Sequence, residues 1–364
     1  MDGNTTPVDY FYIYNYTDNF SLYDFQEECE QTLNGSEYFL PTIYFLIFFT
    51  GFVGNLLVIL VVGNKKRGGR LVDTFVVNLA LADLIFVLTL PLWAISAMEK
   101  NYWNFGLFSN FLCKMSSYII AVNRFSNIFF LTCMSVDRYL AVVKLMDSRH
   151  LRSSLCIRAT CLAVWASSLV LGIPSLVYRK VDVNFCTEDQ SSPFFLGISL
   201  VMALLTFIFP VFIIVLCYGT IIIHLNKHCA AAGNPRAEAR RKHSLKMVLC
   251  IIVAFVVSWL PYNVFKSITV ILHLGDVKAS SEVHSQLKNG LVISCCLAFL
   301  NSCVNPAIYF FLDHHFRRRA EMMYKTCLGK SKMLQSFNSS ASFTNGYTSE
   351  SNGTTGGRSQ IQMV

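Results

Sequence analysis

Seven long apolar stretches restrict this chain to a small set of folds. A helix needs about 20 apolar residues to cross a hydrocarbon core of roughly 30 Å, and each stretch is at least that long. Lipid satisfies no backbone hydrogen bonds, so spanning segments are helices or the strands of a closed barrel. The roughly ten-residue alternation of a membrane barrel is absent. The sequence therefore predicts an all-α membrane protein with helices at 39–63, 71–98, 110–145, 155–178, 192–225, 241–273 and 287–312.

Positive charge predicts how these helices are oriented. The loops after the first, third and fifth stretches, with the C-terminal tail, hold most of the 30 lysines and arginines, and residues 1–38 hold none. Positively charged loops stay in the cytoplasm. We therefore expect residues 1–38 outside and the tail inside a cell membrane that the chain crosses several times. The net charge of +8 is then an orientation signal, so nucleic-acid binding is not implied.

Residues 1–38 have the composition of an extracellular segment. They are acidic and rich in tyrosine, which favours attraction of a basic protein, although a solubilising leader explains the same composition. Four glycosylation sequons lie here, at Asn4, Asn15, Asn19 and Asn34. Three cysteines fall outside the membrane: Cys113 and Cys186 can form one disulfide across the pore mouth, and Cys29 has no obvious partner.

The C-terminal part divides into two segments. Residues 313–328 read as a short amphipathic helix that lies on lipid, with Cys327 as a candidate for palmitoylation. Residues 329–364 are rich in Ser, Thr, Gly and Asn, which predicts disorder. Phosphates added there by receptor kinases would create an acidic surface for arrestin.

Motifs occur once per stretch and in a fixed order along residues 39–328. They are Gly54-Asn55; the run Asn78 to Asp83; Cys113 with Asp137-Arg138-Tyr139; Trp165 and Pro174; Pro210 and Tyr218; Phe255 with Trp259-Leu260-Pro261; and Asn301 with Asn305-Pro306-Ala307-Ile308-Tyr309. Together they resemble the rhodopsin-like (class A) G-protein-coupled receptors, which are bundles of seven transmembrane helices followed by a short eighth. Thr89-Leu90-Pro91 and Trp103 are similar to the peptide and chemokine branch, in the neighbourhood of the apelin and angiotensin receptors.

The resemblance implies a switch at the cytoplasmic side. Arg138 is expected to pair with Asp137 at rest and to face the G protein after activation. Tyr139, Tyr218, Asn305, Pro306 and Tyr309 complete this predicted switch. The resemblance also implies a relay above it, made of Phe255, Trp259 and the kink at Pro261, which removes a helix hydrogen bond.

A lone carboxylate in the second stretch predicts a polar centre. Asp83 is costly in a membrane without partners, and the amides of Asn55, Asn123, Asn127, Asn301 and Asn305 can surround it. The resemblance implies an allosteric sodium ion here, and a water-filled polar network is the alternative. No other cofactor is expected.

Two cations inside the bundle point to the ligand. Arg124 lies near the floor of the expected pocket and Lys266 lies higher, and the pocket is also expected to include Trp93. Arg124 either pairs with Asp83 or binds an acid on the ligand, since arginine suits carboxylates. No acid in the third stretch is placed to hold an amine. The expected ligand is a basic peptide or chemokine-like protein that inserts a carboxylate.

The predicted function is a receptor that activates heterotrimeric G proteins of the Gi/o class. A transporter would need broken helices and inverted repeats, and no internal repeat is found. A non-signalling scavenger receptor usually has a damaged Asp-Arg-Tyr triplet, whereas residues 137–139 are intact. The histidines lack a metal-binding spacing, so no enzyme is predicted.

Overall fold

The computed structural model describes residues 35–63, 72–144, 153–188, 193–228, 235–277, 280–314 and 316–326. The chain forms two compact units, residues 1–316 and 317–364, and each is described by itself. The sequons, Cys29 and Cys327 named above lie outside the described residues. The whole of the tail at 329–364 and residues 1–34 of the N-terminal segment also lie outside the described residues.

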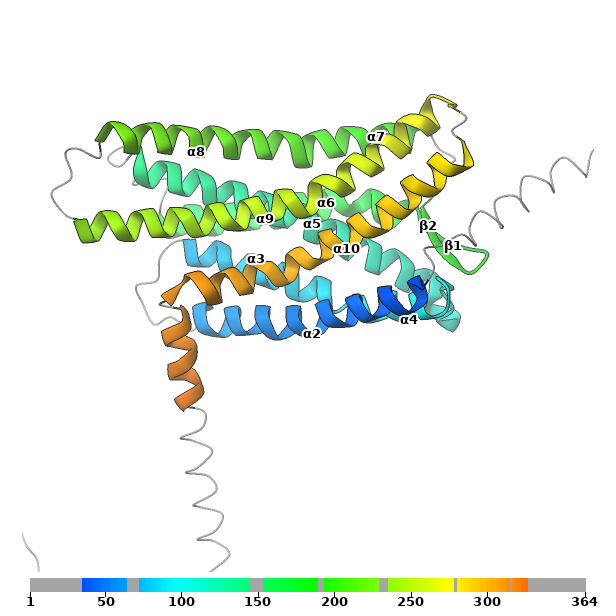
Figure 1. Cartoon of the computed structure of the whole chain (residues 1–364), viewed down its shortest axis with the longest axis horizontal. Helices are drawn as coiled ribbons and strands as arrows, with labels where there is room; N and C mark the ends of the chain where they lie inside the picture. Colours follow the sequence, from blue (N-terminus) through cyan, green and yellow to red (C-terminus); the bar gives the residue numbers. More distant parts are fainter. Residues whose placement is uncertain are drawn as a thin grey trace, which may run out of the picture. The chain divides into compact units, whose positions relative to one another are not determined.

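Unit 1 is a bundle of helices lying side by side, with one short hairpin at an end of the bundle (Figure 1). The α-helices are α2 (Ser36–Gly63), α3 (Val72–Val87), α4 (Leu90–Met98), α5 (Ser109–Val142), α6 (Ser154–Val177), α7 (Pro193–Ala203), α8 (Phe209–His228), α9 (Pro235–Leu274) and α10 (Ser281–Leu312). The other elements are the 3₁₀ turn η1 (Gly106–Phe108), the strands β1 (Arg179–Asp182) and β2 (Phe185–Glu188), and the π-helical turn η2 (Leu204–Ile208).

The described residues contain seven helices or helix pairs that are long and apolar enough to cross a membrane. They match the seven predicted stretches in order, and the boundaries differ at polar ends. The last helix begins at Ser281, where the Ser280 hydroxyl accepts a hydrogen bond from the Val283 amide, rather than at residue 287. The sixth extends back to Pro235, and proline suits a first helical position.

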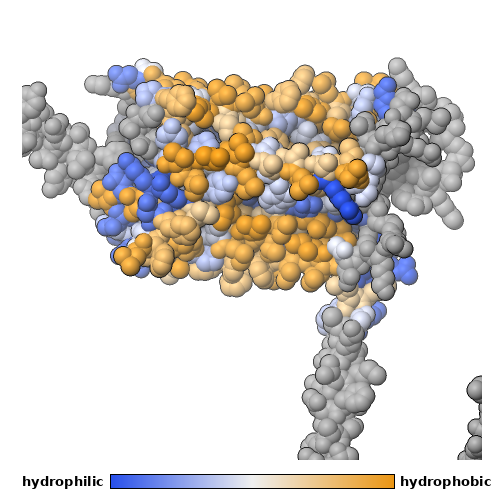
Figure 2. Space-filling model, turned by 180° about the vertical axis from the view of Figure 1, so that it is seen from behind, coloured by the Kyte–Doolittle hydropathy of each residue, from blue (hydrophilic) through white to orange (hydrophobic). Residues whose placement is uncertain are grey.

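The outer surface of the bundle is apolar, as a membrane span requires. Many large hydrophobic side chains are exposed, among them Leu46, Phe49, Leu162 and Phe212. Figure 2 shows hydrophobic residues across the middle of one face, with hydrophilic residues mainly toward its ends. Polar side chains such as Asp83 and Asn127 are instead buried between the helices.

Helix α5 lies at the centre of the bundle. It packs against α3, α6, α8, α9 and β1, and its 34 residues include neither glycine nor proline. At about 1.5 Å per residue it is about 51 Å long. Its side chains therefore reach the end of the bundle that carries the hairpin (the outer end), the middle of the bundle and the opposite end (the inner end).

Prolines modify several of the other helices. Pro261 and Pro306 lie inside α9 and α10, which continue through them. In the fifth span, the π-helical turn η2 lies directly before α8, whose second residue is Pro210. A proline removes one backbone donor and crowds the preceding turn, and a wider π turn relieves that crowding.

The C-terminal end of α10 leads into the short helix predicted at 313–328. The Asp313 carboxylate accepts a hydrogen bond from the Phe316 amide at 3.2 Å, and residues 316–326 are helical. Phe316 is buried, with its ring centroid 6.4 Å from that of Tyr309. Unit 2 begins at the next residue, and within it Lys325 pairs with Glu321 at 2.8 Å.

Candidate ligand pocket and switch

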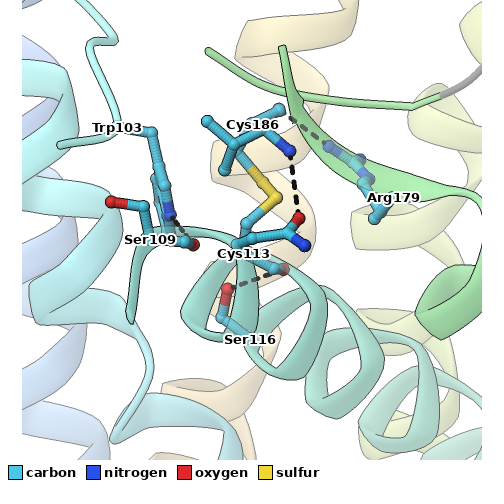
Figure 3. The surroundings of a disulfide bond; sticks show 8 residues. Trp103, Ser109, Cys113, Ser116, Arg179 and Cys186 are labelled. Atoms are coloured by element: carbon cyan, nitrogen blue, oxygen red, sulfur yellow. Dashed lines mark hydrogen bonds between the residues drawn. A yellow bond between two sulfur atoms is a disulfide. The ribbon is translucent and has the colours of Figure 1, made fainter. Parts of the chain in front are cut away.

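The hairpin β1–β2 forms a roof that is fastened to α5. The predicted disulfide between Cys113 and Cys186 is present, with the two Cα atoms 5.6 Å apart. Cys186 pairs with Val181 across the hairpin. The Val181 amide donates a hydrogen bond to the Asn110 side-chain oxygen on α5 at 3.3 Å. Figure 3 shows the disulfide joining the hairpin to α5, with Arg179 alongside. The strands were not predicted, because each is only four residues long.

A tight turn sets the register of this hairpin. Asp182 pairs with Phe185, so only Val183 and Asn184 form the loop. Both have positive φ, 44° and 65°, which is the pattern of a type I′ turn. Asparagine tolerates this region, whereas a β-branched valine is strained there. The strain indicates that the surrounding contacts, including the disulfide, hold the turn in place.

The connection between α4 and α5 packs beneath the hairpin. The Trp103 amide donates to the Asn184 carbonyl at 2.6 Å. The Trp103 indole Nε1 donates to the Ser109 carbonyl at 2.8 Å (Figure 3). Trp103 is 1% exposed, and its ring lies 4.8 Å from that of Trp93. This contact places Trp93 against the cavity described next.

A cavity of about 220 Å³ lies between the hairpin and the helices. Trp93, Arg124 and Lys266, the three residues predicted to contact a ligand, all line it. The wall also includes residues that the sequence did not single out, among them Arg179, Glu188 and Tyr262. Three cationic side chains and one carboxylate thus meet among its described lining residues.

Arg124 points into this cavity from α5. Its guanidinium carbon lies 4.7 Å from the Phe125 ring centroid and 5.9 Å from those of both Trp259 and Tyr262. Aromatic faces attract a cation electrostatically. Its Nε atom is buried and has no hydrogen-bond partner among the residues that the structure describes. Of the two possibilities for Arg124, this position favours a ligand acid over Asp83.

Lys266 differs from the sequence expectation, because it already has a partner. Its ammonium pairs with the Glu188 carboxylate of β2, and the two side chains are 21% and 18% exposed. Burial disfavours a charged carboxylate, but the positive charges of Lys266, Arg179 and Arg124 outweigh it and hold the pKa of Glu188 below its usual value. Glu188 is therefore an anion built into the pocket wall.

The sequence held a signal for Glu188. Residues two apart in a strand lie on the same face, so Glu188 follows Cys186 on the side that faces α5. Recognising it requires the disulfide and the strand together, and Glu188 belongs to no motif.

Aromatic side chains continue from the cavity into the bundle. Trp259 lines the cavity, and its ring lies 6.1 Å from that of Phe255, which in turn lies 6.4 Å from Phe207. Phe207 belongs to η2. Phe255 is 1% exposed and Pro261 lies two residues beyond Trp259 in α9. The predicted relay residues Phe255 and Trp259 therefore form, with Phe207, a row of tilted aromatic rings between α9 and η2.

The polar centre surrounds Asp83 below the cavity. The Asp83 carboxylate accepts hydrogen bonds from the amides of Asn123 at 3.0 Å, Asn127 at 2.8 Å and Asn305 at 2.9 Å. Asn301, one turn before Asn305 on α10, is also buried. Three of the five expected asparagines, from α5 and α10, therefore bond to Asp83 of α3, whereas the Asn55 amide donates to the carbonyls of Gly51 and Ser302.

The donor set of this centre fits a hard cation. The side-chain oxygens of Asn55, Asn127, Asn301 and Asn305 are buried without hydrogen-bond partners among the described residues. Unpaired buried acceptors are costly, and a carboxylate with amide oxygens is the ligand type that sodium prefers. These residues fit the ion that the resemblance implied.

The inner end holds the predicted switch. The Arg138 guanidinium pairs with the Asp137 carboxylate at 2.8 Å. Tyr218 on α8 and Tyr309 on α10 are buried, and their hydroxyls have no hydrogen-bond partner within the described part of the chain. Arg138 and Tyr309 line one small cavity of about 20 Å³. Tyr139, the residue after Arg138, is half-buried.

Comparison with known proteins places this arrangement in a family. The family model for the 7 transmembrane receptor (rhodopsin family) matches residues 54–309. The chain is 36% identical over 311 residues to the probable G-protein coupled receptor 25 of Mus musculus, covering 84% of this chain and 83% of that protein. It is 36% identical over 306 residues to G-protein coupled receptor 15 of Mus musculus, covering 83% of each.

The human type-1 angiotensin II receptor is 33% identical over 318 residues, with 84% of this chain and 87% of that receptor covered. The roofed cavity, the polar centre and the inner switch lie within the matched residues. The chain is therefore a multi-pass membrane protein that belongs to the rhodopsin family of seven-transmembrane G-protein-coupled receptors.

Proposed function

We propose that this receptor binds one end of a basic extracellular peptide or chemokine-like protein and activates heterotrimeric G proteins of the Gi/o class. The observation that carries the proposal is the Arg124 guanidinium, which enters the outer cavity with its Nε unpartnered among the described residues. A carboxylate is the natural partner for such a group. The likeness to a receptor named for angiotensin II supports a peptide ligand.

The size and charge of the cavity support entry of a chain end. A volume of about 220 Å³ accommodates a short segment rather than a folded domain, so the body of the ligand stays outside. The eight acidic residues within 1–38 would attract a basic body. They are Asp2, Asp9, Asp18, Asp24, Glu27, Glu28, Glu30 and Glu37.

The inner half supports signalling. The intact Asp137–Arg138 pair and the buried Tyr218 and Tyr309 match a switch, which argues against a scavenger that binds without signalling. In this proposal residues 1–38 are extracellular and the tail is cytoplasmic at the plasma membrane. The tail engages receptor kinases and arrestin, residues 313–328 lie on lipid, and a sodium ion occupies the Asp83 centre at rest.

The ligand test compares a free terminal carboxylate with its amide. Secreted basic peptides are screened in both forms on wild type and Arg124→Gln. Breaking a buried charged pair on one side costs about 3–5 kcal/mol, so amidation lowers affinity at least about a hundredfold. Arg124→Gln loses a similar amount, and the two changes together are far less than additive.

Lys114→Gln is the matched control, because Lys114 is a cation on the same helix that does not line the cavity. It leaves the preference for the free acid intact. Equal binding of the amide and the free acid by wild type would exclude a terminal carboxylate. Nucleotide exchange on purified Gi, Gs and Gq then reads the G-protein class, and exchange confined to Gs or Gq would contradict the Gi/o assignment.

A further inference from the structure

Glu188 places an anion of the protein itself where a ligand anion would bind. It lines the same cavity as Arg124, Arg179 and Lys266, and it is the carboxylate among the described lining residues. Without Glu188 the cavity would present three positive charges. With it, Lys266 is neutralised while Arg124, deeper on α5, keeps its unpartnered Nε.

The hairpin holds Glu188 in this place from one side. Cys186, two residues earlier, is bonded to Cys113 of α5, and the Arg179 guanidinium donates to the Cys186 carbonyl at 3.2 Å. The Glu188 side chain then reaches Lys266 on α9. Its backbone is fixed, but its carboxylate is held by a side-chain ion pair that rotation about the side-chain bonds can break.

We propose that Glu188 is a tethered counter-ion that occupies an outer anion subsite at Lys266 and Arg179 until a second acidic group of the ligand displaces it. This inference rests on the proposed function, in which a first carboxylate binds Arg124. The receptor would thereby select ligand ends that carry two anionic groups, a terminal carboxylate and an acidic side chain close to it.

The selectivity follows from the cost of an unpaired buried charge. A neutral ligand group that moved Glu188 aside would leave Lys266 without a counter-charge, which is strongly unfavourable. An anionic group replaces the charge that it removes, and the displaced Glu188 carboxylate turns toward water, which its 18% exposed side chain already meets. The Glu188–Lys266 ion pair would thus discriminate against ligands that lack a second anionic group.

The test uses simple anions as probes on the purified full-length receptor. Binding of succinate, glutarate and adipate, which carry two carboxylates, is measured by thermal shift against acetate, which carries one, at constant ionic strength in chloride. Glu188→Gln is expected to bind the best dicarboxylate about tenfold more tightly than wild type, because the competing ion pair is gone. Acetate affinity is expected to change less than about threefold. Lys266→Gln on the Glu188→Gln background removes the gain.

Asp182→Asn is the matched control, since Asp182 is an exposed acid of the same hairpin that does not line the cavity. It binds as wild type does. Protection of Cys186 from alkylation checks that each variant keeps its hairpin, and the exchange Glu188→Lys with Lys266→Glu restores the pair if Glu188→Gln fails to fold. An unchanged dicarboxylate affinity in Glu188→Gln, or a gain that survives Lys266→Gln, overturns the inference.

Arg124→Gln separates the inference from the proposed function. If it abolishes acetate binding while Glu188→Gln gives no gain, the deep site stands and the tethered counter-ion fails. If acetate binding survives Arg124→Gln while the gain persists, the deep carboxylate site fails and the outer subsite stands alone.

Discussion

At the scale of single residues, Arg138 illustrates how one charge is kept in a membrane protein. Its guanidinium is bonded to the adjacent Asp137 at 2.8 Å, and the two side chains are 14% and 6% exposed. A charge at that depth is costly unless it is paired. The hydroxyls of Tyr218 and Tyr309 are buried without hydrogen-bond partners among the described residues, and we propose that Arg138 contacts them once the pair opens. The pair is therefore well suited to a two-state element.

We predict that Arg138→Ala abolishes G-protein activation without loss of the folded receptor. The substitution removes the cation that we propose faces the G protein, and the Asp137 carboxylate, which is 6% exposed, loses this ion pair. Surface expression and agonist-stimulated nucleotide exchange are measured together. Arg158→Ala, which removes an exposed arginine near the inner end of α6, is the control and keeps full exchange. Full exchange by Arg138→Ala would refute the switch assignment.

At the scale of elements, the hairpin β1–β2 connects the outer ends of helices that are distant in sequence. The disulfide ties it to α5, and the Glu188–Lys266 pair ties it to α9. Trp103 packs beneath the turn, and the strained Val183 is kept in it. The roof of the cavity is thus positioned by contacts between the hairpin and other parts of the chain, rather than by the pairing of its two short strands alone.

We predict that Cys186→Ser lowers both thermal stability and ligand affinity. The disulfide closes a loop with a sequence separation of 73, and such a bridge contributes about 2–4 kcal/mol. Thermal unfolding of the purified receptor and ligand binding are the measurements. Cys156→Ser removes a free cysteine near the N-terminal end of α6 and is expected to change neither. Finding both thiols alkylatable in folded wild type would show that the bridge is absent.

At the scale of the whole molecule, three sites lie in series along one bundle. The cavity, the polar centre and the inner switch draw residues from α5 and from helices that contain proline, such as α9 and α10. Trp259 lines the cavity and lies between it and the polar centre. We propose that coupling between the outer and inner ends passes through Trp259 and then through Asp83 and its asparagines.

We predict that agonist affinity falls as sodium rises. An ion held by the Asp83 centre only at rest stabilises the resting state, and by linkage it weakens agonist binding. Agonist binding is measured in sodium and in a bulky organic cation at equal ionic strength. Asp83→Asn removes the carboxylate and is expected to abolish the difference. Equal agonist affinity of wild type in both salts would leave a water-filled network at this centre.

The sequence predicted the helices well because lipid allows few alternatives for a long apolar segment. It predicted the Asp83 cluster because a buried carboxylate needs partners, although no local sequence pattern fixes the hydrogen bonds of this cluster. It missed Glu188 and Arg179, whose positions depend on a hairpin of four-residue strands and on a disulfide across the chain. Lys266, expected to meet a ligand directly, is paired for the same reason.

The unbroken helix α5 has a consequence for how this chain can change. Cys113, Arg124, Asn127 and Arg138 all lie on it, so their angular positions around one axis are fixed relative to each other. Inserting one residue rotates everything beyond it by about 100° and advances it by about 1.5 Å. A single insertion between Arg124 and Arg138 would turn the switch away from its partners while leaving the roof correct. Insertions and deletions are thus expected in the loops rather than in α5, whose length fixes the spacing between the cavity and the switch.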